Sequence, residues 1–95
     1  MTRPTLLTVA ELEARLTALP LWRLTGNAIT RTITFTGFPE AVAFVTRLVG
    51  PAEAMQHHPD IDVRYHRVVI TLSTHDVGGL TASDVTLAAQ IDALV

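Results

Sequence analysis

The segment AITRTITFT, residues 28–36, alternates apolar and polar side chains from end to end. Such alternation is typical of a β-strand that buries one face and leaves the other polar. Arg31 falls in register with the apolar set, and four threonines line the opposite face, toward solvent or another subunit. The apolar set consists of Ile29, Ile33 and Phe35.

Turn signals extend this strand into a sheet. Gly26-Asn27 is a turn dipeptide suited to positive φ, which predicts a hairpin between residues 28–36 and a short strand over residues 21–25. Two more strands are predicted downstream, because residues 63–65 and then residues 67–74 alternate in the same way.

Three helices are predicted from apolar spacing and end signals. Thr8-Val9-Ala10-Glu11 has the spacing of a capping box. Phe38-Pro39-Glu40 places proline and an acidic residue in the first turn of a second helix, which Gly50-Pro51 should kink or break. The predicted ranges are about 9–19, from 38 to the break at 50, and about 82–94 after a cap at Thr81.

The predicted order is α-β-β-α-β-β-α, in one domain over residues 1–95. Hairpins separated by helices favour an α+β fold, with a four-stranded antiparallel sheet covered on one face by helices.

The composition removes several classes of chemistry. The 95 residues include no cysteine, which excludes a thiolate nucleophile and a Cys-ligated metal. All seven basic residues are arginine, so a lysine Schiff base is excluded. A net charge of −2 argues against a nucleic-acid partner. With no signal peptide and no stretch of ~20 apolar residues, we expect a cytoplasmic protein without a membrane partner.

Residues 53–59, EAMQHHP, hold the densest group of side chains suited to proton transfer. An imidazole has an unperturbed pKa of ~6.5 and can give or take a proton near neutrality. Pro59 disfavours helix at the residue before it, which places His57 and His58 on a loop or a helix end. If the helix runs on, Glu53 lies one turn before His57 and its carboxylate meets that imidazole.

Two further residues extend this set, and each has a simpler interpretation. His75 falls at the end of the last predicted strand, and Asp84 falls in the first turn of the last helix, where an acidic residue is favoured anyway. A metal site built from His57, His58 and His75 is the competing interpretation. Adjacent histidines are awkward ligands for one ion, because common zinc patterns space two ligands three to five residues apart. Residue chemistry alone therefore reaches a small α+β domain with a candidate histidine acid–base site.

The spacing of these residues resembles the signature of a known protein family. The pattern Glu53-x3-His57-His58-Pro59-x5-Tyr65-x9-His75-x8-Asp84, together with Gly79-Leu80-Thr81, resembles the signature of the pterin-4a-carbinolamine dehydratases. These proteins are also known as dimerisation cofactors of a hepatocyte nuclear factor. The resemblance covers about residues 12–94, and the family's fold agrees with the predicted order of elements.

The resemblance implies an enzyme that dehydrates 4a-hydroxytetrahydropterin to quinonoid dihydropterin, in the recycling of a tetrahydropterin. It implies no metal and no other cofactor, because the pterin is the substrate. At the matching positions His57 and His75 would be the acid–base pair, and His58 would hold the substrate.

The resemblance also assigns supporting roles. Asp84 would orient an imidazole, expected to be that of His75, and Glu53 would support His57 or contact the pterin. Backbone groups near Ser73 and Thr74 would pair with the edge of the pterin, and Tyr65 would serve in packing. The implied catalytic set is His57, His58, His75 and Asp84, and the implied substrate-binding set is Glu53, Ser73 and Thr74.

Assembly is the remaining expectation, since relatives are homodimers or homotetramers. The alternative function is a non-catalytic protein-binding or assembly module on the same fold. Such a role would use a helix surface or the sheet edge, and not the histidines.

Overall fold

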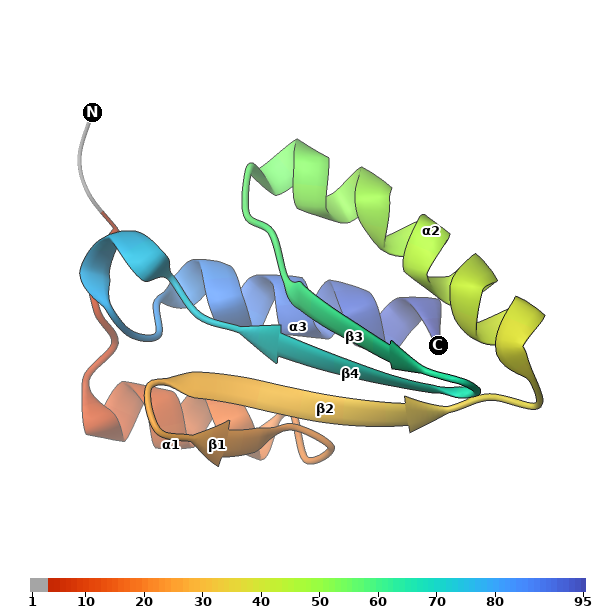
Figure 1. The fold of residues 1–95 in the computed structure, drawn as a ribbon. Coiled ribbons are helices and arrows are strands. Elements are labelled where there is room, and N and C mark those ends of the chain that lie inside the picture. The colour runs from red at the N-terminus through yellow and green to blue at the C-terminus, as the bar shows by residue number, and fades with distance from the viewer. Residues whose placement is uncertain (1–3) are drawn as a thin grey trace.

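The structure is a computed structural model and describes residues 4–95 (Figure 1). Its order of elements is the predicted one, so the α+β class is confirmed. The elements are α1 (Val9–Thr17), β1 (Arg23–Thr25), β2 (Ala28–Thr34), α2 (Phe38–Met55), β3 (Asp60–Arg64), β4 (Arg67–Leu72), a 3₁₀ turn η1 (His75–Val77) and α3 (Ala82–Leu94).

The four strands form one antiparallel sheet in the order β1-β2-β4-β3. A two-residue turn at Gly26-Asn27 joins β1 to β2, and Gly26 adopts the positive φ of 60° that the dipeptide favours. The long central pair β2–β4 sets the register of the core, with Ile29 opposite Leu72 and Ile33 opposite Val68.

The helices cover one face of the sheet, as the alternation predicts (Figure 1). The core includes five sheet residues that are at most 5% exposed, and side chains of α2 and α3 pack against them. On the opposite face Thr32 and Thr34 remain exposed. The largest fully buried side chains include Phe44, Ile29, Leu48, Ile70, Leu72, Leu87, Ile91 and Val68.

Gly50-Pro51 is predicted to kink or break the second helix, and the prediction of a break is wrong, because α2 runs through Pro51 to Met55. Proline removes one backbone hydrogen bond and crowds the residue before it, but a preceding glycine has no Cβ to crowd. Leu48 and Ala52, on either side of Pro51, are both buried, so burial against the core holds the turn in place.

The prediction that Tyr65 serves in packing is also wrong. Tyr65 lies in the two-residue turn between β3 and β4, with φ of 53°, and 69% of it is exposed. Its ring contacts that of His66 edge to face at 4.8 Å. The pairing of Arg64 with Arg67 requires this tight turn, which directs the tyrosine out of the sheet. Among the described residues no helix is long and apolar enough to cross a bilayer.

Candidate active site

The C-terminal end of α2 positions the two adjacent histidines, His57 and His58. Gln56 adopts the left-handed conformation, with φ of 51°. The amide of Gln56 donates to the carbonyl of Glu53 at 3.2 Å, and the amide of His57 donates to that of Ala52 at 3.1 Å. These two bonds form a Schellman motif, which ends the helix and reverses the chain. The reversal sends His57 and His58 away from the helix axis in different directions.

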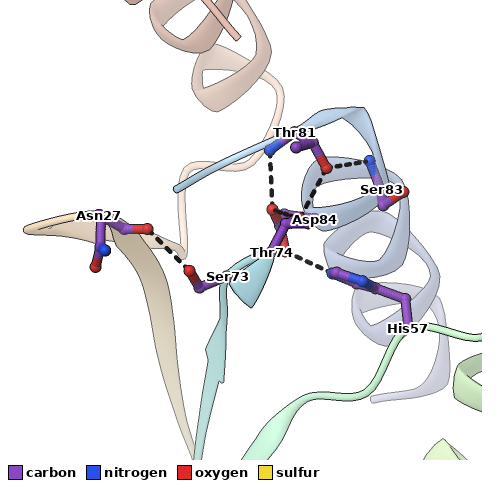
Figure 2. A network of polar contacts seen from close by, with 7 residues as sticks. All are labelled: Asn27, His57, Ser73, Thr74, Thr81, Ser83 and Asp84. Carbon is purple, nitrogen blue, oxygen red and sulfur yellow. Dashed lines mark hydrogen bonds and ion pairs between the residues drawn. The ribbon is translucent and has the colours of Figure 1, made fainter. Parts of the chain in front are cut away.

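His57 lies against α3, where Nε2 is 2.6 Å from Oδ1 of Asp84 (Figure 2). The Asp84 side chain is fully buried, and the His57 side chain is 13% exposed. The expectation that Asp84 pairs with His75 is therefore wrong. Asp84 is the third residue of α3, and the first turn of this helix faces the end of α2 and not the exposed side chain of His75.

Three hydrogen bonds hold the carboxylate of Asp84. Its Oδ2 accepts from the hydroxyl of Thr74 at 2.8 Å and from the backbone amide of Thr81 at 2.9 Å, while Oδ1 faces the imidazole of His57 (Figure 2). The bond to Thr81 is one half of a capping box at the start of α3. One carboxylate therefore caps a helix and holds an imidazole.

His58 pairs with Glu53, at 2.5 Å between Nε2 and Oε2, and both side chains are 60% exposed or more. The expectation that Glu53 supports His57 is wrong, because that spacing requires the helix to continue through His57. The reversal at Gln56 instead leaves His58 on the side of Glu53. Exposed pairs of this kind add little stability, so the contact can open for a ligand at small cost.

The end of β4 supplies the other wall. Ser73 donates its hydroxyl to the carbonyl of Asn27 at 3.2 Å, which ties this wall to the turn between β1 and β2. The backbone amide of Thr74 donates to the carbonyl of Gly79 at 2.8 Å and its hydroxyl donates to Asp84 at 2.8 Å, so both donors of Thr74 are engaged within the protein. His75 opens the 3₁₀ turn and is exposed.

These walls enclose a hollow of about 230 Å³. The three predicted histidines line it together, with Ser73 and Thr74, while Asp84 is buried behind His57. Glu53 instead lines a neighbouring apolar hollow that shares His58. The full lining is Gln56, His57, His58, Ser73, Thr74, His75 and Asp76. Among residues 4–95 no three His, Cys, Asp or Glu side chains converge as ligands for a metal ion.

Thr81 lies beside the candidate site, although the sequence predicted it only as the cap of a helix. Its hydroxyl lies 2.8 Å from that of Thr74, and it is 2% exposed. The signal was present in the spacing Thr81-x-x-Asp84, which is that of a capping box with an aspartate at its third position.

Fold and site together define a small α+β protein in which imidazoles, one of them held by a buried carboxylate, line a polar hollow. Residues 5–94 match the family model described as pterin 4 alpha carbinolamine dehydratase. The chain belongs to this family of hydro-lyases, as the resemblance indicated.

Proteins of similar sequence support this membership of the family. A protein of Roseiflexus castenholzii, provisionally named pterin-4-alpha-carbinolamine dehydratase, is 51% identical over 90 residues, which are 95% of this chain and 97% of the relative. A protein of Chloroflexus aurantiacus with the same provisional name is 51% identical over 89 residues, or 94% of this chain and 96% of the relative.

Two solved structures share the fold. A transcriptional coactivator/pterin dehydratase from Brucella melitensis superposes with a TM-score of 0.90 at 35% identity, over 95% of this chain and 98% of its own. A pterin dehydratase-like protein described as a RuBisCO assembly factor in the alpha-carboxysome gives a TM-score of 0.65 at 26% identity, over 77% and 87%.

Proposed function

We propose that this chain dehydrates 4a-hydroxytetrahydropterin to quinonoid dihydropterin in the hollow between the end of α2 and the end of β4. The observation that carries the proposal is the convergence of His57, His58 and His75 on one hollow, in a chain of this family. The volume of about 230 Å³ is below the ~300–1,000 Å³ of pockets for drug-sized ligands, which suits a compact bicyclic ring.

The reaction needs two proton movements and no other reactant. One acid protonates the hydroxyl on C4a, the C4a–O bond breaks, and water leaves. The lone pair on N5 then forms the C4a=N5 double bond, and a base removes the proton from N5. One proton is given and one is taken, so the enzyme ends with its protons redistributed and no net charge gained. Imidazoles can serve as both acid and base near neutral pH.

His57 is suited to take the proton from N5. With Asp84 accepting from Nε2–H, the neutral ring keeps its lone pair on Nδ1. When Nδ1 takes a proton, the buried carboxylate stabilises the imidazolium that forms, as a carboxylate does in hydrolase triads.

His75 is suited to protonate the departing hydroxyl, because its exposed ring can recover a proton from water. His58, paired with Glu53 at the rim, is suited to hold the pterin, and Glu53 can accept from the amino group or ring N–H of a pterin that displaces the pair. Ser73 and Thr74 line the opposite wall, and the edge of the pterin would lie against them.

The test is the rate of dehydration of 4a-hydroxytetrahydropterin, followed by absorbance in the presence of the protein and in buffer. We expect His57→Ala and His75→Ala each to lower the enzyme-dependent rate by roughly 10²–10⁴-fold, the usual contribution of one acid–base residue. His66→Ala is the matched control, since this fourth histidine lies in the β3–β4 turn outside the hollow. Wild-type protein no faster than buffer would end the proposal.

We further propose that copies of this chain associate through α2. Phe38, Val42 and Val49 follow a helical stripe and are 42–58% exposed, which is costly in water unless a second copy covers them. Light scattering coupled to gel filtration should give a homodimer or homotetramer for the wild type and a smaller species for Val42→Asp. A monomeric wild type would contradict this. The second candidate function is a non-catalytic assembly module, since the carboxysome relative is described as an assembly factor. An oligomer without dehydratase activity would favour it.

A further inference from the structure

We propose that Thr81 is a positioning residue for the reaction, and that it acts through Thr74 and Asp84 on the proton of His57. This inference rests on the proposed function, because it assumes that His57 moves a proton. It begins from three polar side chains that the fold buries almost completely: Thr74 is 5% exposed, Thr81 is 2% and Asp84 is 0%. Buried polar groups are costly unless each makes a hydrogen bond, so the donor and the acceptor of each bond can be assigned by counting protons.

The direction of each hydrogen bond follows from the count of protons. The single hydroxyl proton of Thr74 goes to Oδ2 of Asp84, because a carboxylate can only accept. The contact of 2.8 Å between the hydroxyls of Thr74 and Thr81 must then be donated by Thr81. Thr81 in turn accepts from the backbone amide of Ser83 at 3.3 Å. The chain therefore runs from the helix backbone through two hydroxyls to the carboxylate (Figure 2).

Every neighbour of Asp84 in this arrangement is a donor. Oδ2 accepts from Thr74 and from the backbone of Thr81, so Oδ1 is left for Nε2 of His57 at 2.6 Å. The carboxylate cannot rotate away without breaking both bonds at Oδ2. His57 is thereby fixed as the tautomer protonated on Nε2, which leaves Nδ1 as the basic nitrogen.

The rest of the chain contains a natural comparison. Thr8 and Glu11 form the same capping box at the start of α1, but their hydrogen bonds are exposed and lie outside the hollow. If Thr81 only caps α3, its loss should resemble the loss of Thr8. If Thr81 also positions Asp84, its loss should change the imidazole of His57 as well.

The experiment compares Thr81→Val, Thr81→Ser and Thr8→Val by two readouts. Long-range nitrogen–proton NMR of the imidazole identifies the tautomer of His57 without any need for activity, and steady-state kinetics separate kcat from KM. Thr81→Val removes the donor that orients the hydroxyl of Thr74, so the carboxylate of Asp84 is held less firmly against Nε2 of His57. Both tautomers should then be populated, and kcat should fall roughly five- to tenfold, the size of one lost hydrogen bond, with little change in KM. Thr81→Ser should behave as wild type, because it keeps the hydroxyl.

Thr74→Val is the second variant, in case Thr81→Val does not fold. It leaves both cap contacts of Thr81 in place and removes the hydroxyl donor to Asp84, so the same change of tautomer is expected. The inference is overturned if both valine variants keep the wild-type tautomer and kcat and lose only thermal stability, as Thr8→Val should. An inactive wild type with the expected change of tautomer would instead refute the proposed function and leave the positioning role standing.

Discussion

Replacing Asp84 by asparagine is the sharpest perturbation of the proposed mechanism. The side chain keeps its shape but exchanges one acceptor oxygen for an NH₂ donor. Thr74 and the backbone of Thr81 both donate to Oδ2, so the amide oxygen must take that position. The NH₂ group then faces Nε2 of His57, at the position where 2.6 Å now separates nitrogen and oxygen. That nitrogen can only accept, and the ring must carry its proton on Nδ1.

The magnitude follows from this change of tautomer. With Nδ1 protonated, His57 has no lone pair to offer a substrate unless the ring turns and breaks its contact with residue 84. The same exchange in the Ser-His-Asp triad lowers kcat by about 10⁴-fold for the same reason. We expect a loss of roughly 10²–10⁴-fold in kcat here, the range for a disabled acid–base residue. Because the cap and both bonds at the amide oxygen survive, folding stability should fall by only about 1–2 kcal/mol.

The assay is steady-state dehydration with urea unfolding of the same samples. Asp92→Asn is the matched control, since Asp92 is also an aspartate of α3 but contacts Trp22 and Arg31 outside the hollow. The control should lose stability and keep its rate. A folded Asp84→Asn protein within threefold of the wild-type rate, in a protein that His57→Ala inactivates, would refute the assigned role of Asp84.

Three further predictions concern parts of the fold that support the site. Asp92→Ala removes the acceptor for Trp22 Nε1 and the partner of Arg31, whose side chain is only 11% exposed, so unfolding in urea should show a loss of about 2–4 kcal/mol; a change below 0.5 kcal/mol would contradict this. The backbone amide and then the hydroxyl of Thr8 hold the pKa of Glu11 below its ordinary value, so its stabilising effect is full above the unfolded pKa and is lost as pH falls through the folded one. The melting temperatures of wild type and Glu11→Gln should therefore converge as the pH falls below the ordinary pKa of the Glu11 carboxyl, and a difference that stays constant with pH would count against this. Gln56→Gly removes the cost of a left-handed side-chain residue and should stabilise the protein by about 0.5–1 kcal/mol in urea unfolding, whereas a loss would show that the bond from its side chain to Glu53 matters more.

Most of the fold was predictable because its signals are local. Alternation in residues 28–36, a turn dipeptide at Gly26-Asn27 and a capping box from Thr8 to Glu11 each decide a structure over a few residues. The predicted break at Gly50-Pro51 is wrong because local propensity opposes a helix there, while burial of Leu48 and Ala52 in the core maintains the helix. The prediction for Tyr65 is wrong because the predicted strand extends into the hairpin turn. In a strand, a shift of one residue decides whether a side chain faces the core or solvent.

The sequence predicted most of the residues that line or support the candidate site, but it did not predict which side chains pair with one another. Spacing predicted that Glu53, one helical turn before His57, contacts that imidazole. Because Gln56 adopts the left-handed conformation and ends the helix, Glu53 contacts His58 instead. Pairing Asp84 with His57 depends on how α2 and α3 pack, over a sequence separation of 27 residues. No periodicity carries such information, since the contact exists only after both helices have docked on the sheet.

The dehydration rate of 4a-hydroxytetrahydropterin, measured for wild type, His75→Ala and His66→Ala at equal concentrations, tests most directly whether these imidazoles form an active site. Dehydration by the histidines of the hollow predicts a wild-type rate well above buffer, a matching rate for His66→Ala, and a loss of roughly 10²–10⁴-fold for His75→Ala. A wild-type rate equal to that of buffer, or a His75→Ala protein as fast as the His66→Ala protein, would contradict it.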